Sequence, residues 1–286
     1  MVSIGLIGAG AMGSALGANW RAGGAEVLTC VVDRSDRTRE LVSQAGIDTV
    51  ATLEAVTAAD IVVSVVPPTD ATAVANTIAA AANRAGTTPL VIDLNAIAPT
   101  TVDGIATALK TAGLDLVDGS ISGPPPRPGR SATRIYLSGP RANQLAALAS
   151  PWAEVFELPG PAGRASALKM CTASMYKGTN ALIMQAMLTA RTHGVVEEFL
   201  ADVAHIWPER VPNWHTDIAL AATKSDRFVG EMREIARTQG DAGLPPEMFE
   251  GIAAAYARAA GTEFGHTDPE RISRDLTVEQ VLEGLE

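Results

Sequence analysis

The chain has 286 residues and a formal net charge of −10, with 47% hydrophobic and 19% charged residues. This length and hydrophobic content suffice for two domains with buried cores. No block of like charges stands out, so neither a nucleic-acid-binding surface nor a disordered tail is indicated. The N-terminus lacks a basic segment and no apolar run reaches the roughly 18 to 20 residues that span a bilayer, so we expect no export or membrane role.

The two cysteines, Cys30 and Cys171, both lie in apolar stretches. We expect reduced core cysteines in a reducing cytoplasm, rather than a disulfide or a metal pair. No His/Cys or His/Glu cluster has metal-ligand spacing, and no nucleophile elbow occurs. Metal-dependent and hydrolytic chemistry are therefore not expected.

Short β-branched runs alternate with alanine-rich helical stretches from residue 3 to about residue 158. The expected strands are "SIGLIG", "EVLTCVV", "DIVVSVV", "PLVIDL" and "LDLVDG", followed by the pair "TRIYLSG" and "EVFELPG". This alternation predicts an α/β domain with a parallel sheet covered on both faces. After "LPGPAGRA" helical stretches run to the end, broken at "IWPERVPNW", "QGDAGLPPEM" and "GHTDPERIS". We predict an α/β domain over residues 1–160 and an all-α domain over residues 161–286.

A glycine-rich loop follows the first expected strand. "LIGAGAMGSALGANW" places Gly8, Gly10 and Gly13 in the pattern G-x-G-x-x-G at the start of a helix. Gly8 would make the tight turn, Gly10 would let a pyrophosphate approach the backbone, and Gly13 would let helix and strand pack closely. The N–H groups of the helix start, including Ala11 and Met12, would bind the phosphates. This context predicts a Rossmann dinucleotide-binding domain; the alternative is a glycine-rich turn without a ligand.

The second expected strand ends at "VVDRSDRTRE". Asp33, twenty residues after Gly13, stands where an acidic residue binds the adenosine ribose hydroxyls of NAD. Arg34, Ser35 and Arg37 follow at once and suit the 2′-phosphate of NADP. We expect NADP or NAD as cofactor, with a slight preference for NADP; the alternative is that the arginines are a solvated face of the next helix.

Further stretches resemble the β-hydroxyacid dehydrogenase superfamily, which includes 3-hydroxyisobutyrate and 6-phosphogluconate dehydrogenases and the related imine reductases. "VVPP", residues 65–68, and "DLNAIAP", residues 93–99, resemble its two cofactor-side loops. The resemblance implies that Val66, Pro67 and Asn95 lie on the nicotinamide side.

Two motifs of the same family follow in its order. "DGSISGPPP", residues 118–126, is similar to its substrate motif, with Ser122 and Gly123 matching and Pro124 replacing the usual second glycine. "GRASALKMCTA", residues 163–173, places Lys169 where the family has its catalytic lysine, but Ala173 stands where the family usually has a substrate-holding asparagine. The triple proline, "SMYKG" and "GEMREIART" resemble the subgroup with a 6-phosphogluconate-dehydrogenase-like helical domain.

The helix expected over residues 164–193 carries few polar side chains. Tyr176, Lys177 and Asn180 fall on the same face as Lys169, so we expect them beside the substrate, and Lys177 or Asn180 could replace the missing asparagine. The alternative for both lysines is that they extend from a buried helix to solvent. Because this helix is apolar nearly all round, we also expect a homodimer.

The resemblance implies an NAD(P)-dependent dehydrogenase or reductase that acts on a small hydroxy acid or its oxo form. Lys169 would be the general acid or base, with a pKa lowered by desolvation, and Ser122 would orient the substrate. "PPPRPGRSATR" adds Arg127, Arg130 and Arg134, which either bind an anionic substrate or form a solvated loop. An imine reductase and a non-catalytic NAD(P)-binding sensor remain as alternative functions.

Overall fold

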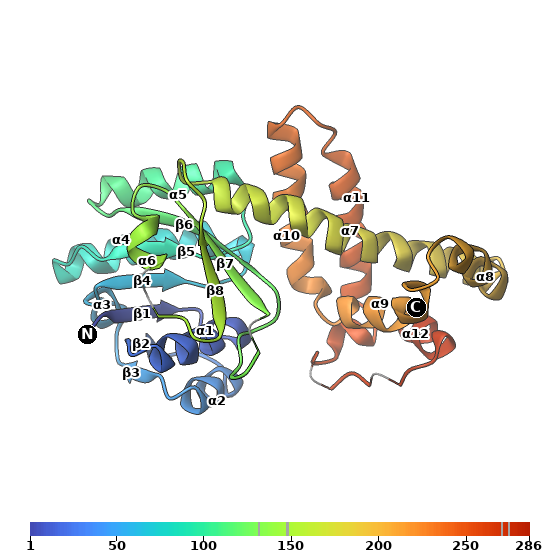
Figure 1. Cartoon of the computed structure of the whole chain (residues 1–286), viewed down its shortest axis with the longest axis horizontal. Helices are drawn as coiled ribbons and strands as arrows, with labels where there is room; N and C mark the ends of the chain where they lie inside the picture. Colours follow the sequence, from blue (N-terminus) through green and yellow to red (C-terminus); the bar gives the residue numbers. More distant parts are fainter. Residues whose placement is uncertain (131, 147–148, 270, 274) are drawn as a thin grey trace. The chain divides into compact units, whose positions relative to one another are not determined.

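A computed structural model describes residues 1–130, 132–146, 149–269, 271–273 and 275–286. It contains two compact units, an α/β unit over Met1–Met170 and a helical unit over Cys171–Glu286 (Figure 1). Each unit is described by itself below.

The α/β unit is built on one eight-stranded sheet with the strand order β3-β2-β1-β4-β5-β6-β7-β8. Its neighbours pair in parallel, except that β6 and β7 are antiparallel. In chain order the strands are β1 (Ser3–Ile7), β2 (Glu26–Cys30), β3 (Asp48–Val50), β4 (Ile61–Ser64), β5 (Leu90–Asp93), β6 (Leu116–Ser122), β7 (Thr133–Ser138) and β8 (Ala153–Glu157). The predicted Rossmann-type α/β fold is confirmed.

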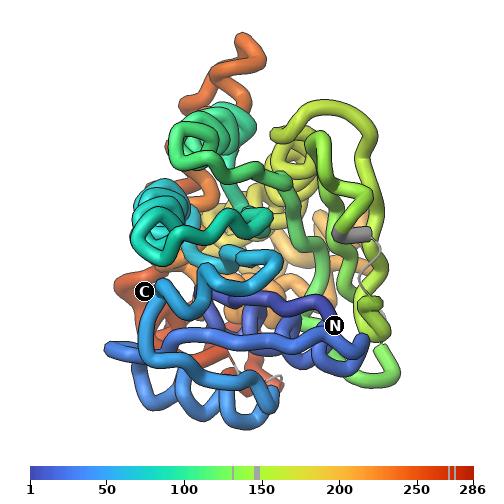
Figure 2. The backbone as a smooth tube through the Cα atoms, turned by 90° about the vertical axis from the view of Figure 1, so that its left-hand side faces the viewer, coloured from blue at the N-terminus to red at the C-terminus, as the bar shows by residue number. Residues whose placement is uncertain are grey.

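Helices cover both faces of this sheet, as the nearly all-apolar strands require. The helices of the unit are α1 (Ala11–Ala22), α2 (Asp36–Gln44), α3 (Leu53–Thr57), α4 (Ala71–Ala85), α5 (Pro99–Thr111) and α6 (Ala142–Ala146). One core places Leu16 and Trp20 of α1 against β1 and its neighbours. The core on the other face packs Ile78 of α4 and Ile105 of α5 against the sheet, and Figure 2 shows these two helices side by side.

Helix α7 (Arg164–Thr192) starts in the α/β unit and continues into the helical unit. The remaining helices are α8 (Val196–Ile206), α9 (Trp214–Ala222), α10 (Ser225–Asp241), α11 (Glu247–Ala260) and α12 (Val278–Gly284). The breaks after α8, α10 and α11 fall at the three predicted interruptions, whereas the short break between α9 and α10, at residues 223–224, was not predicted. Inside this unit Phe228 of α10 meets the ring of Tyr256 of α11 edge-on, with ring centroids 5.2 Å apart.

Three details differ from the sequence-based expectations. Strand β3 has three residues and was not predicted, because so short a segment carries no readable alternation. The units divide after Met170 and not near residue 160, because the first turns of α7 are bonded to β6. Cys30 and Cys171 are both free thiols, but Cys171 is exposed in the chain, so the expectation of a core cysteine is wrong there.

None of the helices described is both long and apolar enough to cross a membrane.

Candidate functional site

The glycine loop joins β1 to α1, and each of its three glycines meets a different steric demand. Gly8 has φ of +89°, and a Cβ atom there would lie 2.1 Å from the carbonyl oxygen of Val65. A Cβ atom on Gly13 would lie 2.2 Å from the carbonyl oxygen of Gly8, so only glycine lets α1 pack this closely. A Cβ atom on Gly10 would meet nothing within 4 Å. The loop is therefore closed where it turns and packs, and open at Gly10, where a pyrophosphate would need room.

Gly10 is also the N-cap of α1, which begins at Ala11. Glycine has no side chain that could bond to the first-turn N–H groups, so Ala11 and Met12 begin the helix next to the open side of the loop. Such a helix start, with its positive dipole end, is a site for phosphate.

The segment after β2 holds the residues predicted to surround the adenosine ribose. Asp33, Arg34, Ser35 and Arg37 are all exposed, and Asp33 has φ of +59°, a left-handed conformation that aspartate tolerates better than most residues. The Ser35 hydroxyl accepts a hydrogen bond from Thr38 N at 3.3 Å and so caps α2. Ser35 therefore has a structural role, and Arg34 precedes α2 while Arg37 lies in its first turn.

The loops after β4 and β5 are tied together by Asn95, which is buried. Its Oδ1 accepts a hydrogen bond from Val66 N at 2.6 Å, and its Nδ2 donates to Ser64 Oγ at 3.1 Å and to Asp93 Oδ2 at 2.7 Å. These bonds hold the backbone of Val66, next to the exposed Pro67, at the carboxyl ends of the parallel strands. The Asn95 side chain therefore binds the loop rather than facing the outside, a direction that its sequence position did not reveal.

Asp93, the last residue of β5, is a buried carboxyl that sequence reasoning missed. Burial raises its pKa from 3.8 to about 7, against hydrogen bonds from Asn95 that lower the pKa, and the neighbouring Asp118 raises it further. Asp118 is its partner in the β5–β6 register. Two carboxyl groups thus lie buried side by side where β5 and β6 run together.

Strand β6 ends with the predicted substrate motif. Ser122 is the last residue of the strand and is half-buried. Gly123 has φ of +104°, and a Cβ atom there would lie 2.2 Å from the carbonyl oxygen of Ala132, so the chain can turn here only with glycine. The carbonyl oxygen of the exposed Pro124 accepts a hydrogen bond from the Thr133 hydroxyl at 2.6 Å, which fixes the loop beyond the motif.

Lys169 lies in the second turn of α7 and belongs to the α/β unit. Its Nζ donates a hydrogen bond to the carbonyl oxygen of Ile121 at 2.5 Å, so the ammonium is held at the residue before Ser122. The side chain is half-buried, so part of it is accessible to solvent, as the alternative of a lysine that extends from a buried helix also requires. The structure thus places the Lys169 ammonium against the backbone of β6, one residue before Ser122.

Tyr176, Lys177 and Asn180 belong to the helical unit and separate into two environments. Lys177 is buried, forms an ion pair with Glu231 of α10, and lies 4.3 Å from the centre of the Phe228 ring. Tyr176 is 64% exposed and hydrogen-bonds to the side chain of Asn180. The predicted polar face of α7 is therefore divided, because Lys177 turns toward a carboxylate that lies 54 residues further along the chain.

The arginines after the β6 motif also separate. Arg127 and Arg130 are paired through their backbones by an isolated antiparallel β-bridge in an exposed loop. Arg134 lies on β7 and pairs with Glu154 at 3.2 Å, so its guanidinium is engaged with β8. Arg127 and Arg130 are the two that remain in the loop next to Ser122.

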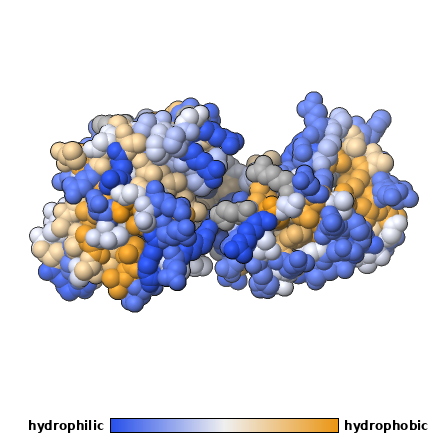
Figure 3. Space-filling view, turned by 90° about the horizontal axis from the view of Figure 1, so that it is seen from below, coloured by the Kyte–Doolittle hydropathy of each residue, from blue (hydrophilic) through white to orange (hydrophobic). Residues whose placement is uncertain are grey.

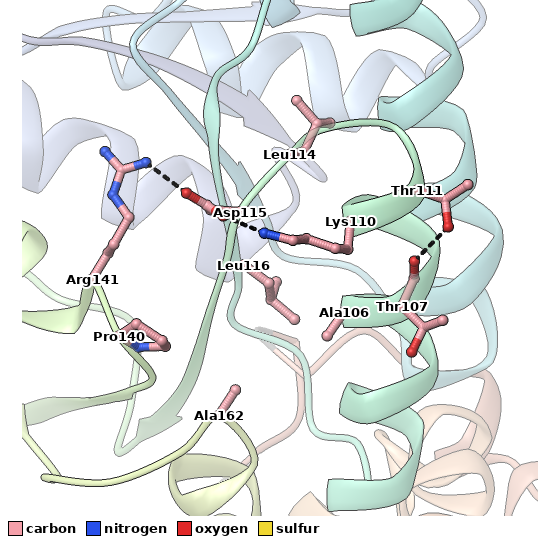
Figure 4. A pocket seen from close by; sticks show the side chains of 10 residues that line it. All are labelled: Ala106, Thr107, Lys110, Thr111, Leu114, Asp115, Leu116, Pro140, Arg141 and Ala162. Atoms are coloured by element: carbon pink, nitrogen blue, oxygen red, sulfur yellow. Dashed lines mark hydrogen bonds and ion pairs between the residues drawn. The ribbon is translucent and has the colours of Figure 1, made fainter.

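A cavity of about 550 Å³ lies at the other end of β6, beside Asp115 and Leu116 (Figure 4). Asp115 pairs there with Lys110 at 3.8 Å and with Arg141 at 3.2 Å. Because β6 runs from Leu116 to Ser122, this cavity is at the end of the strand away from the candidate site. Among the residues that the structure describes, no group of three or more His, Cys, Asp or Glu side chains is placed to hold a metal ion.

Residues 3–148 match the family described as the NAD binding domain of 6-phosphogluconate dehydrogenase, and residues 190–259 match a domain of unknown function (DUF1932). The match over the first region covers half of the chain and the loops described above. The chain therefore belongs to the β-hydroxyacid dehydrogenase superfamily, a class of NAD(P)-dependent oxidoreductases.

Solved structures share this fold over nearly the whole chain. The conserved protein MTH1747, of unknown function and described as similar to 3-hydroxyacid dehydrogenases, is 25% identical, with a TM-score of 0.66 over 91% of this chain and 97% of that one. A 3-hydroxyisobutyrate dehydrogenase from Salmonella typhimurium is 17% identical, with a TM-score of 0.71 over 99% of both chains. An imine reductase from Streptomyces aurantiacus is 20% identical, with a TM-score of 0.56 over 99% of both chains. No curated protein matches the sequence significantly.

Proposed function

We propose that the protein transfers hydride between a nicotinamide cofactor and a small hydroxy acid or its oxo form, with Lys169 as the general acid or base. The observation that carries this proposal is the placement of the Lys169 ammonium on the carbonyl of Ile121, directly before Ser122 and in the same unit as the glycine loop. When bound, the cofactor supplies or accepts the hydride. Lys169 moves the proton at the substrate oxygen, and the Ser122 hydroxyl orients that oxygen.

The cofactor is held, on this proposal, by Gly8, Gly10, Gly13 and the first N–H groups of α1. The steric pattern of the loop supports this role, because the open side at Gly10 adjoins a helix start. Val66 and Pro67 border the nicotinamide, while Asn95 sets the position of their loop through the hydrogen bond to Val66 N.

The preference for NADP over NAD rests on the exposed Arg34 and Arg37 beside Asp33. Changing both arginines to alanine should raise the Michaelis constant for NADPH far more than that for NADH, because only NADPH presents a 2′-phosphate to a guanidinium. Equal effects on the two cofactors would make the arginines a surface feature only.

Beyond the α/β unit, we propose that the exposed Tyr176, held by Asn180, contributes to the substrate side, and that Arg127 and Arg130 favour an anionic substrate. Lys177 is less suited to substrate binding, because its ammonium is buried against Glu231. The two free cysteines support a reducing cytoplasm.

A homodimer is proposed from the apolar surface of α7. Met175 and Leu182 lie seven residues apart, hence on one face of the helix, and their side chains are 73% and 69% exposed. Figure 3 shows hydrophobic surface on the helical unit among hydrophilic residues. Large exposed apolar side chains on a long helix are typical of a surface that a second copy covers.

The test is the consumption of NADPH and NADH with a panel of small 2- and 3-oxo acids. Lys169→Ala should lower turnover by roughly 10² to 10⁴, the usual contribution of positioned proton transfer, while cofactor binding stays nearly unchanged. Lys110→Ala is the matched control, since Lys110 is an exposed lysine of the same unit at the far end of β6. Near-normal turnover by folded Lys169→Ala would refute the assignment.

The alternative functions give different outcomes in the same assay. An imine reductase would consume NADPH with a cyclic imine such as 1-pyrroline and not with the oxo acids. The similar fold of the Streptomyces aurantiacus imine reductase is the reason to add a cyclic imine to the panel. A sensor would bind the cofactor without turning over any panel member.

A further inference from the structure

Helix α7 begins without a capping side chain of its own. Its first residue is Arg164, and Gly163 before it has φ of +96° and no side chain to accept a hydrogen bond. The first N–H groups of an α-helix lack partners within the helix and need an acceptor from elsewhere, most of all when the helix start is buried. Ala165 and Ser166, in the first turn of α7, are fully buried.

Asp118 in the middle of β6 supplies that acceptor. Its Oδ2 accepts hydrogen bonds from Gly163 N at 2.8 Å, Ala165 N at 3.0 Å and Ser166 N at 3.1 Å. The Ser166 hydroxyl donates to its Oδ1 at 2.6 Å, and the Ser138 hydroxyl donates to its Oδ2 at 2.7 Å. The carboxylate, with no exposed surface, is thus a cap for α7 supplied by a strand 45 residues earlier.

The same strand holds α7 at a second point. Ile121, three residues beyond Asp118 on β6 and so about 10 Å away, accepts the hydrogen bond from Lys169 Nζ. Lys169 is three residues beyond Ser166, a rise of about 4.5 Å along the helix, and its long side chain spans the remaining distance. The bonds at Asp118 and Ile121 together fix both the rotation and the axial position of the first two turns of α7.

We propose that Asp118 is a positioning residue for Lys169: by capping α7, it sets the ammonium beside Ser122. The inference rests on the proposed role of Lys169 but concerns a residue that touches neither substrate nor cofactor, because Asp118 is fully buried. If the cap is lost, the first turn shifts on the strand and the ammonium leaves the carbonyl of Ile121.

A first experiment needs no substrate. Folded protein is treated with limiting acetic anhydride, and the acetylation of Lys169 is measured by peptide mass spectrometry relative to Lys110, whose side chain is 80% exposed. Asp118→Ala should raise this ratio several-fold, since the Lys169 amine loses its contact. Asp118→Asn keeps an acceptor oxygen for the helix N–H groups and should change the ratio little.

The matched control is Asp60→Ala. Asp60 is another carboxylate of the α/β unit that bonds a backbone N–H and a hydroxyl, both of Ser3. Its loss should leave the Lys169 ratio unchanged. An unchanged ratio of Lys169 to Lys110 acetylation in folded Asp118→Ala would overturn the inference, whether or not the protein has the proposed activity. If Asp118→Ala does not fold, Asp118→Asn takes its place. An acetylation ratio in Asp118→Asn equal to that of urea-unfolded protein would then overturn the inference too.

A second experiment joins the cap to turnover through a double-mutant cycle on the panel acid that the wild type reduces fastest. Asp118→Ala alone should lower kcat by about 10²-fold, the cost of a misplacement of about 1 Å, with the Kd for NADPH unchanged. In the Lys169→Ala background it should lower kcat no further, because the positioned group is gone. A full additional loss of kcat in the Lys169→Ala background would make Asp118 merely structural. The absence of turnover with every panel acid would refute the proposed function and would leave the acetylation result valid.

Discussion

Lowering the pH from 8 to 5 should stabilise the wild-type protein by about 2 to 3 kcal/mol relative to the Asp93→Asn variant. The reason is the buried carboxyl of Asp93, whose pKa is raised from 3.8 to about 7, first by burial and then by the neighbouring Asp118. In the unfolded chain the same carboxyl returns to its ordinary pKa.

The sign follows from the protons bound in each state. Between pH 3.8 and about 7 the folded protein holds a proton on Asp93 that the unfolded chain has released, so the free energy of unfolding falls as the pH rises. The slope is about 1.4 kcal/mol per pH unit within this window and vanishes above it. From pH 8 down to pH 5 the contribution therefore grows over roughly two units, which gives the value above.

The assay is urea unfolding of both proteins at several pH values across this range. Titrating groups that do not interact with Asp93 cancel in the difference between wild type and Asp93→Asn. A change in the hydrogen bonds with Asn95 that does not depend on pH adds a constant offset to this difference and leaves its slope unchanged. Asp103→Asn, at an exposed position on α5, is the control and should give a difference independent of pH. A flat difference for Asp93→Asn, or one of opposite slope, would refute the argument from burial.

Three further outcomes are expected. Gly8→Ala should lower the free energy of unfolding by about 1 to 3 kcal/mol, because Gly8 has a positive φ and lies close to the loop after β4. Gly10→Ala should keep the stability and weaken NADPH binding in a fluorescence titration. Equal losses of stability in the two variants would contradict the distinction. Lys177→Ala should lower the free energy of unfolding by about 3 kcal/mol, because it removes a buried partner of Glu231. A loss below about 1 kcal/mol in urea unfolding would argue against a buried ion pair. Leu182→Glu should convert a dimer into a monomer of about 30 kDa in sedimentation, and a wild-type monomer at micromolar concentration would exclude the dimer.

The glycine loop could be predicted in detail because its pattern of three glycines lies within one short segment between a strand and a helix. The turn at Gly8, the open side at Gly10 and the close packing at Gly13 depend on the backbone of β1, α1 and the loop after β4. The alternation of apolar runs with helical stretches likewise predicts the succession of strands along the chain and the point after which the strands stop. Only the three-residue β3 was too short to show such a pattern.

The contacts that assemble the candidate site could not be predicted in this way, because they join residues far apart in the sequence. Asp118 meets Ser166 across 48 residues, and nothing in either segment specifies the other. Asn95 was expected on the nicotinamide side, but the direction of its side chain depends on Val66 N and on the buried Asp93. Competition among buried polar groups decides such directions, and it is visible only after the chain has folded.

The same competition distinguishes the lysines, which composition and helical spacing leave equivalent. Lys177 faces a buried carboxylate, so transfer of its proton to a substrate would leave Glu231 as a buried charge with a weaker set of partners, at a high cost in free energy. Lys110 lies at the opposite end of β6, in an exposed pair with Asp115. Lys169 instead donates to a neutral carbonyl at the end of β6 where the strand turns at Gly123, so its proton can move without stranding that acceptor as a charge. On the proposal that Lys169 moves the substrate proton, its placement by strand β6 supports this role more than burial in an apolar helix as such.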